Sequence, residues 1–241
     1  MAQSPIWSTP PESLSLETGE VHVWRIELKQ PGSLLERFRS TLEPDELHRA
    51  SRFHFEKHRS GFVVGRGFLR DVLSRYLKTK AETLRFSYGD YGKPALHGTL
   101  KFNLSHSHEV ALLAITEDRQ IGVDVEHIRS DFATEDIARR FFSRLEVENF
   151  NRLPTEEQVA AFFRCWTRKE AFMKATGRGF SQPLDAFDVT LAPGVAAALL
   201  HVAEDDASRW SMSDIDVGAD YAGALVVEGP ISKTRFWHFS A

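Results

Sequence analysis

Apolar side chains recur along this chain with two periods, and each period predicts one kind of element. Residues 21–28 (VHVWRIEL) alternate apolar and polar positions, which predicts a strand. Residues 58–78 and residues 157–176 carry apolar side chains at helical spacing, so we expect a long helix in each. A shorter helix is expected at residues 43–50, because Pro44 suits a first helical turn.

Most of the remaining chain predicts strands. These are LRFSY (84–88), KFNLSHS (101–107), EVALLAI (109–115), IGVDVEHI (121–128), FDVTL (187–191), WSMSDIDV (210–217) and AGALVVE (222–228). The segment 132–150 is mixed. When residue 62 is aligned with residue 162, each Phe-led helix precedes a set of strands, which hints at two similar α+β halves. Gly61, Gly65 and Gly67 interrupt the first long helix, so we expect another part of the chain to pack closely there.

Composition narrows the class of protein. With 241 residues, 42% of them hydrophobic, the chain can form one large domain or two small ones with true cores. A net charge of −4 without a long single-sign run does not favour nucleic-acid binding. The single cysteine, Cys165, excludes an intramolecular disulfide. The first 20 residues lack signal-peptide character and no apolar run could span a bilayer, so we expect a soluble cytoplasmic protein without membrane association.

The stretch IGVDVE places Asp124 and Glu126 on one face of a strand, beyond Gly122. Taken alone, this pattern is more typical of acidic side chains in water. The other interpretation is a site for a hard cation, because Mg²⁺ binds one or two carboxylates together with phosphate oxygens and water.

The second long helix carries charges on its apolar face. Its apolar stripe comprises Phe162, Cys165, Trp166, Phe172 and Met173. Lys169 falls inside that stripe and must either extend to solvent or meet an anion. Glu170 and Lys174 lie at its edge, where they form either an ordinary i,i+4 pair or part of a site for a metal-bound phosphate.

The stretch FNLSHSHE and the preceding YGKP carry further polar groups. His-x-His is a possible zinc pair, but no other Cys or His cluster has suitable spacing. A hydrolase is not favoured either, because the strand–turn–helix elbow of a serine nucleophile is missing. Lys93, Ser105 and His106 fit either a polar hairpin end or contacts to a phosphate or nucleotide. The basic run Arg49, Arg52, Lys57, Arg59 and Arg66 is either a solvated face or a source of charge for a phosphorylated ligand.

The order of these motifs is more specific than any one of them. YGKP, FNLSHS, IGVDVE, RFFS and WTRKEAFMKATGRGF together resemble the 4′-phosphopantetheinyl transferases of the larger, Sfp-type class, over roughly residues 45–190. The resemblance implies an α+β fold of two similar α/β halves related by a pseudo-twofold axis. Each half would be a small antiparallel sheet packed on a long helix, with the active site in the cleft between them. We expect residues 1–119 to contact the nucleotide end and residues 120–241 to hold the metal and the catalytic helix.

The resemblance also implies a reaction of the holo-acyl-carrier-protein synthase type. Coenzyme A would give its phosphopantetheine group to a serine of an apo acyl or peptidyl carrier protein, leaving adenosine 3′,5′-bisphosphate. Asp124, Glu126 and Glu170 would bind Mg²⁺ on the pyrophosphate. Glu170 would be the general base, directly or through a water, and Lys174 would neutralise the phosphoryl group under attack; both are catalytic, together with Asp124.

The nucleotide end would be held by residues of the first half. These are Lys93, Ser105 and His106, with Arg49 and Arg52 near the 3′-phosphate. Many relatives carry Arg where this chain has Gly61, which leaves Arg59 and Arg66 as candidates to supply that charge.

A local basic and apolar patch is needed for the acidic carrier, and ARRFFSRLE offers Arg139, Arg140 and Arg144 around exposed-looking Phe. The two-halves pattern favours a monomer. Two other functions stay open: another Mg²⁺-dependent enzyme that cleaves a nucleotide pyrophosphate, and a non-catalytic protein of this fold that binds coenzyme A or a carrier.

Overall fold

The computed structural model describes residues 7–179, 182–203 and 205–240. Its helices are α1 (Gly32–Arg39), α2 (Pro44–Ser51), α3 (Glu56–Leu77), α4 (Glu135–Phe141), α5 (Arg144–Asn151) and α6 (Thr155–Thr176), with short 3-10 turns at Ala81–Thr83, Leu184–Ala186 and Ala207–Arg209. Its strands are β1 (Glu20–Glu27), β2 (Ser87–Tyr88), β3 (Pro94–Ala95), β4 (Leu100–Ser107), β5 (Val110–Glu117), β6 (Ile121–His127), β7 (Phe187–Val189), β8 (Leu199–Val202), β9 (Trp210–Asp214), β10 (Tyr221–Glu228) and β11 (Lys233–His238).

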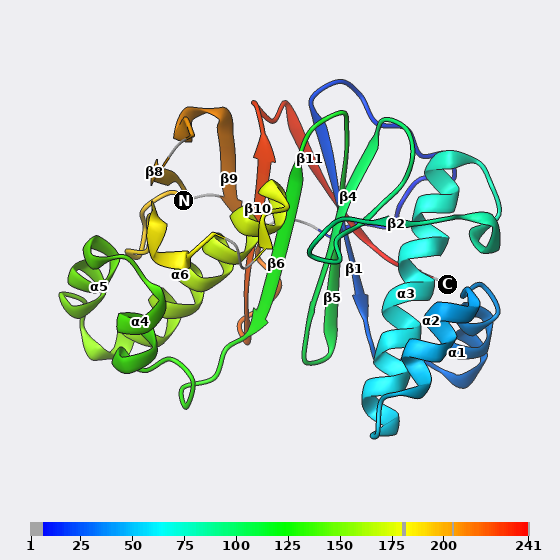
Figure 1. Ribbon diagram of the computed structural model, residues 1–241, viewed down its shortest axis with the longest axis horizontal. Helices are drawn as coiled ribbons and strands as arrows, with labels where there is room; N and C mark the ends of the chain where they lie inside the picture. Colours follow the sequence, from blue (N-terminus) through cyan, green and yellow to red (C-terminus); the bar gives the residue numbers. More distant parts are fainter. Residues whose placement is uncertain (1–6, 180–181, 204, 241) are drawn as a thin grey trace.

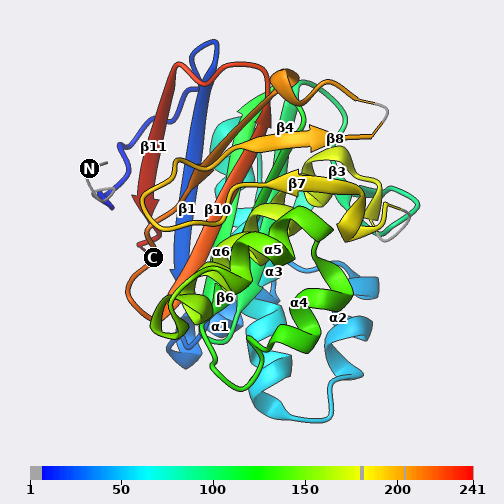
Figure 2. The same cartoon turned by 90° about the vertical axis from the view of Figure 1, so that its left-hand side faces the viewer.

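The elements form four layers in the order helix, sheet, sheet, helix (Figure 1). The first sheet has the strand order β11-β1-β5-β4, and α3 covers its outer face. The second sheet has the order β6-β10-β9 and is covered by α6, with α4, α5 and the small β7–β8 sheet around that helix (Figure 2). The predicted α+β fold with a long helix on a small sheet in each half is therefore confirmed.

Three apolar clusters hold the layers together. Trp24, Phe68 and Leu113 lie in the cluster between α3 and the first sheet, and Phe162 and Phe172 lie in the cluster between α6 and the second. The third cluster lies between the two sheets. It contains Val21, Val23, Leu112, Val123, Val125 and Leu225, all 0% exposed. Because strand side chains alternate, each sheet presents one apolar face to its helix and the other to its partner sheet.

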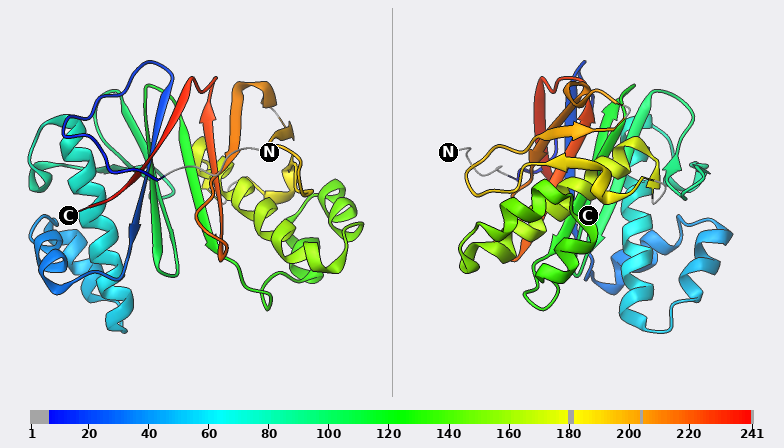
Figure 3. Two further views of the ribbon diagram at one scale, coloured as in Figure 1. Left: turned by 180° about the vertical axis from the view of Figure 1, so that it is seen from behind. Right: turned by 60° about the vertical axis from the view of Figure 1, so that its left-hand side comes forward.

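The end of the chain returns to the first sheet. β11 pairs in parallel with β1, from Glu20 opposite Lys233 to Arg25 opposite His238, as the view from behind makes visible (Figure 3). The first sheet is therefore mixed, whereas a purely antiparallel sheet was expected from the sequence. The functional division at residues 119 and 120 stays a prediction, but the second segment does contribute one strand to the sheet of the first.

The two sheets meet along β4 and β6, where side chains replace a backbone ladder. Oδ1 of Asn103 accepts a hydrogen bond from the Val123 amide at 2.9 Å, and Oγ of Ser107 accepts one from the His127 amide at 3.0 Å. Polar side chains at alternate positions of β4 thus satisfy backbone donors of β6, which would otherwise be buried without partners. This seam brings residues 105–107 (Ser-His-Ser, the SHS motif) of β4 beside Asp124 and Glu126 of β6.

Local expectations hold for most elements, with several differences. Helix α1 and strands β8 and β11 lie outside the expected elements, and the expected strand at residues 84–88 is ordered as a strand only at its last two residues. Close packing at the α3 glycines holds only for Gly67, where an added Cβ would lie 2.2 Å from a side-chain atom of Phe38. At Gly61 and Gly65 no described residue would lie within 4 Å of an added Cβ.

In the described part of the chain, every helix is too short or too polar to cross a lipid bilayer.

Candidate active site

Strand β6 and helix α6 bring Asp124 and Lys174 together. Gly122 permits this approach, since an added Cβ there would lie 2.0 Å from the carbonyl oxygen of Ala171 and 2.4 Å from the amide of Ala175. Those are backbone atoms of the helix, which cannot move aside independently. Only glycine therefore allows α6 to pass directly over the strand that carries the two predicted carboxylates.

Asp124, Lys174 and Ser105 form a compact polar cluster. Nζ of Lys174 lies 2.6 Å from Oδ1 of Asp124 and 2.9 Å from Oγ of Ser105, and that hydroxyl donates to the same Oδ1 at 2.8 Å. Asp124 is 2% exposed, and its second oxygen, Oδ2, is buried without a hydrogen-bond partner among the described residues. A buried carboxylate oxygen without a protein donor is an acceptor for a water or a cation.

Glu126 lies farther along the same face of β6. It is half-buried, and its Oε2 accepts a hydrogen bond from Ser107 at 2.7 Å. Burial raises the pKa of Glu126, and the negative charge of Asp124 raises it further. The SHS motif thus supplies one hydroxyl to each carboxylate of the strand.

Glu170 stands one helical turn before Lys174 on α6. It is half-buried, and burial together with the charges of Asp124 and Glu126 raises the pKa of Glu170 to about 7, against the lowering effect of Lys174. The three carboxylates therefore influence one another electrostatically, as expected of a shared site. In the described ranges, however, no three or more His, Cys, Asp or Glu side chains are arranged to hold a metal ion, so Mg²⁺ binding stays a prediction.

The ammonium of Lys93 binds backbone carbonyls of the second half. Its Nζ donates to the carbonyl oxygens of Ile121 at 3.0 Å and of Lys174 at 2.6 Å. Burial lowers the pKa of Lys93 to about 8. The expected nucleotide contact of Lys93 stays a prediction that these hydrogen bonds do not support.

His106 opens onto a pocket of about 980 Å³ beside the seam. The other lining residues include Phe53, Lys57, His58, Gly61, Phe62 and Ser107. The guanidinium of Arg49 lies 5.3 Å from the ring centroid of Phe62, at the edge of this pocket, and Arg52 is exposed at the end of α2. Burial and the charges of Lys174 and Arg49 lower the pKa of His106, with Asp124 acting in the opposite direction.

Neither candidate replacement for the missing arginine faces this pocket. Arg66 binds Glu46 through Nε at 2.8 Å and through Nη2, which also donates to Tyr88 at 2.9 Å. Arg59 binds Glu56 at 2.7 Å and lines a separate pocket of about 240 Å³. The expectation that either one supplies the charge absent at Gly61 stays a prediction, which these contacts do not support. Lys57, a member of the basic run named in the sequence, and His58, which was not singled out there, line the pocket instead.

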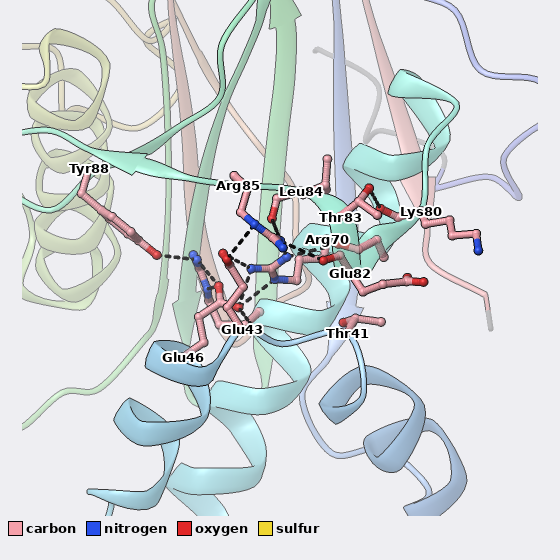
Figure 4. Close-up of polar contacts among 12 residues, drawn as sticks. Thr41, Glu43, Glu46, Arg70, Lys80, Glu82, Thr83, Leu84, Arg85 and Tyr88 are labelled. Atoms are coloured by element: carbon pink, nitrogen blue, oxygen red, sulfur yellow. Dashed lines mark hydrogen bonds and ion pairs between the residues drawn. The ribbon is translucent and has the colours of Figure 1, made fainter.

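Arg66 belongs to a buried ion-pair network that ties α2 to α3. Arg70, 0% exposed, donates to Glu46 at 2.7 Å and to Glu43 at 2.8 Å, and it also reaches the carbonyl oxygens of Ala81 and Leu84 (Figure 4). The charges of the two buried arginines are thereby neutralised by two glutamates, and backbone carbonyls accept further hydrogen bonds from Arg70. Such a network fixes helix positions, so these arginines are not free to bind a ligand.

Lys169 does have the anionic partner that its position demanded. Its Nζ lies 2.8 Å from Oε2 of Glu146 and donates to the carbonyl oxygens of Leu184 and Phe187, at 2.7 and 2.6 Å. Both charged residues are at most 1% exposed. Glu146 in turn accepts from the amides of Ser143 and Val189, so the pair is fully hydrogen-bonded. Lys169 therefore connects α6 to α5 and β7 and lies away from the carboxylate site.

Two profiles of one enzyme family match the chain. The profile of the 4′-phosphopantetheinyl transferase superfamily matches residues 120–226, and that of the 4′-phosphopantetheinyl transferase N-terminal region matches residues 30–118.

Individual proteins match as well. The 4′-phosphopantetheinyl transferase HetI of Nostoc sp. is 40% identical over 97% of this chain and 98% of its own length. The 4′-phosphopantetheinyl transferase Sfp of Bacillus subtilis is 34% identical over 65% of this chain and 69% of its own. A solved structure, the holo-acyl-carrier-protein synthase of Thermotoga maritima, covers 46% of this chain and 63% of its own, with 23% identity and a TM-score of 0.36.

Proposed function

Because the chain belongs to the 4′-phosphopantetheinyl transferase superfamily, we propose that it transfers the 4′-phosphopantetheine group of coenzyme A to a serine of an apo carrier protein. The products are the holo carrier and adenosine 3′,5′-bisphosphate. The observation that carries the proposal is the cluster of Asp124, Lys174 and Ser105 at the seam between the halves, with Glu126 and Glu170 coupled to it. Acyl carriers, as for a holo-acyl-carrier-protein synthase, and peptidyl carriers are both acceptors to test.

The chemistry of the residues present suits a divalent cation, although the described carboxylates are not already arranged around one. Asp124, Glu126 and Glu170 offer hard oxygen ligands, and Oδ2 of Asp124 is buried with no hydrogen-bond partner in the described part of the chain. These three residues would hold Mg²⁺. When bound, the cation would neutralise charge on the pyrophosphate of coenzyme A. The ammonium group of Lys174 forms an ion pair with Asp124.

Of the other two roles, Lys174 acts on the phosphoryl group and Glu170 acts on the acceptor serine. The ammonium of Lys174 stabilises the charge that develops on the phosphoryl group as the serine oxygen attacks. Glu170 accepts the proton of that serine, directly or through a water. A carboxylate whose pKa is raised toward neutrality is a better base than an ordinary one. The serine oxygen forms the new P–O bond, and the adenosine bisphosphate leaves with the electrons of the broken one.

The pocket beside His106 is the proposed place for the nucleotide end of coenzyme A. His106 and Lys57 offer donors to phosphate oxygens, and Phe53 and Phe62 offer apolar surface to the adenine ring. Arg49 and Arg52 on α2 add positive charge near the opening. Ser105 connects this pocket to the carboxylates through its hydrogen bond with Asp124.

For the carrier protein we propose a docking surface on α4 and α5, formed by Arg139, Arg140 and Arg144. All three are exposed, although Arg139 pairs with Glu135 and Arg144 pairs with Glu148 at 3.1 Å. Leu145 beside them is 46% exposed and adds apolar area. The expected exposure of the phenylalanines there is wrong: Phe142 is 3% exposed and Phe141 packs against Trp166. We further propose that a monomer carries out the reaction, because both sides of the site come from one chain.

The proposal is tested by following adenosine 3′,5′-bisphosphate by chromatography, with coenzyme A and Mg²⁺ present throughout. A transferase releases it only when an apo carrier is added. Release from coenzyme A without carrier would indicate a nucleotide pyrophosphate-cleaving enzyme. Binding of coenzyme A without release under either condition would indicate a non-catalytic binding protein.

A further inference from the structure

The short β2–β3 hairpin crosses from the first half to the second. It comprises residues 87–95, which we call the strap. Its first strand is held to the first half, because Nη2 of Arg66 donates to the hydroxyl of Tyr88 at 2.9 Å. Its turn is closed by hydrogen bonds from the Gly89 amide to the Lys93 carbonyl and from the Gly92 amide to the Gly89 carbonyl. The strap is therefore an ordered turn with a fixed anchor on α3.

The far end of the strap contacts the second half at two places. Nζ of Lys93 binds the carbonyl oxygens of Ile121, at the start of β6, and of Lys174, in the last turn of α6. The side chain of Tyr91 packs against Gly179, where an added Cβ would lie 2.6 Å from the ring. The strap thus holds both the strand and the helix that carry the carboxylates.

The backbone carbonyl of Lys174 needs a hydrogen-bond donor from outside α6. The last four carbonyl groups of an α-helix have no intrahelical donor. The Met173 carbonyl accepts a hydrogen bond from the Gly177 amide at 3.1 Å, which forms the usual glycine cap. The Lys174 carbonyl instead accepts a hydrogen bond from the side chain of Lys93. A cation at this end also interacts favourably with the helix dipole. Lys93 therefore acts as a cap that the first half donates to α6.

Lys174 is consequently fixed at both of its ends. Its backbone oxygen is bound by Lys93 at 2.6 Å, and its side-chain Nζ is bound by Asp124, also at 2.6 Å. Gly122 sets the height of α6 above β6, as described above, but it does not restrain the helix along its axis. The strap restrains the C-terminal turn of α6, which carries Lys174, against β6.

We propose that Lys93 is a positioning residue for Lys174, acting through the backbone of α6 and not through the nucleotide. This inference rests on the proposed function, since Lys174 is the group whose placement matters for transfer. A displacement of about 1 Å in a positioned group can reduce catalysis roughly 100-fold. A residue that only places such a group lowers kcat without weakening substrate binding.

The test is the division of the effect between kcat and KM in Lys93→Met. We expect kcat to fall by about 10-fold or more while the KM for coenzyme A stays within about twofold of wild type. Tyr91→Ala, which removes the second strap contact, should lower kcat in the same way but less. Lys101→Met is the matched control, because that lysine donates to the nearby Gly98 carbonyl and not to the second half among the described residues, and it should leave both parameters unchanged.

A raised KM for coenzyme A with an unchanged kcat in Lys93→Met would overturn the proposal and assign Lys93 to the nucleotide. A second measurement does not depend on transfer at all. Hydrogen–deuterium exchange in the C-terminal turn of α6 should be faster in Lys93→Met and Tyr91→Ala than in wild type and Lys101→Met. Unchanged exchange in both strap variants would overturn the proposal that the strap restrains the last turn of α6. Faster exchange in the two strap variants, together with a wild-type protein that transfers nothing to any carrier, would instead retain the role of the strap and reject the proposed function.

Discussion

The Nζ of Lys174 lies 2.6 Å from Oδ1 of Asp124, which joins the last turn of α6 to the middle of β6. The contact depends on Gly122, which allows the two elements to meet, and on Ser105, which reaches the same oxygen from the first half. Three segments far apart in the chain thus converge on one carboxylate oxygen. The proposed chemistry depends on this convergence.

Replacement of Lys174 by Met should reduce kcat/KM for transfer by about 10²–10³-fold, because the positive charge on the phosphoryl group is lost. Glu170→Gln should reduce kcat at least as much, since an amide cannot accept the proton of the serine. Both variants should retain wild-type circular dichroism. Lys80→Met, at an exposed lysine just before the 3-10 turn Ala81–Thr83, is the control and should retain full activity. Normal turnover in either site variant would contradict the assignment.

Gly122→Ala should destabilise the protein by about 2–4 kcal/mol and reduce activity, because its Cβ would collide with backbone atoms of α6. Gly65→Ala is the matched control. It lies inside α3 with nothing within 4 Å of an added Cβ, so it should stabilise the protein by about 0.5–1 kcal/mol. Urea denaturation measures both. Equal stability of the two variants would contradict the described packing of α6 on β6.

Removing one partner of the buried pair Lys169–Glu146 should strongly destabilise the protein. Lys169→Met leaves the buried carboxyl group of Glu146 without its cation, which should lower the free energy of unfolding by about 3–5 kcal/mol. Arg144→Met removes an exposed pair with Glu148, where Arg144 is 94% exposed, and should change stability by less than about 1 kcal/mol. A comparable small loss in both variants would contradict the structural role of Lys169.

The stabilising effect of Lys93 should increase with pH. Burial lowers the pKa of Lys93 from 10.5 to about 8, so between these values the unfolded chain binds more protons than the folded one. The unfavourable desolvation of its charge is fully present below pH 8 and is lost as the pH rises toward 10.5. A neutral amine still has two N–H donors for the two carbonyl oxygens it contacts. The gap in unfolding free energy between wild type and Lys93→Met should therefore widen from pH 7 to pH 9.5 in urea titrations; a narrowing gap would contradict it.

Charge reversal at the docking surface should weaken carrier binding alone. Arg140→Glu combined with Arg144→Glu should raise the KM for the carrier and leave the KM for coenzyme A unchanged, because both side chains are exposed on α4 and α5. Lys233→Glu, exposed on β11, controls for the added negative charge. An unchanged carrier KM in the double variant, or the same rise in the control, would place the docking surface elsewhere.

Periodicity and residue chemistry were sufficient to predict much of this protein. The two long helices follow from apolar spacing, and an anionic partner for Lys169 follows from the cost of burying a lone charge. The identity of that partner does not follow, because Glu146 lies in a segment of mixed pattern and reaches Lys169 only after α5 folds against α6. Long-range pairing, such as β11 beside β1, likewise leaves no local signal.

The cationic residues were the hardest to place from sequence. Lys93 and Arg66 have side chains suited to phosphate, but Lys93 binds backbone carbonyls and Arg66 binds Glu46. Which anion or carbonyl a long cation reaches depends on the tertiary arrangement. The seam residues Asn103 and Ser107 do leave a signal, since they lie on the same face of a strand as Ser105.

The most direct test of the central claim is the intact mass of an apo carrier protein after incubation with this chain, coenzyme A and Mg²⁺. A panel of acyl and peptidyl carriers should include a variant of each in which the acceptor serine is Ala. The account predicts that at least one carrier gains the mass of a phosphopantetheine group, that its Ser→Ala variant gains nothing, and that Glu170→Gln abolishes the gain. Unmodified carriers throughout the panel, or a gain on the Ser→Ala variant, would contradict it.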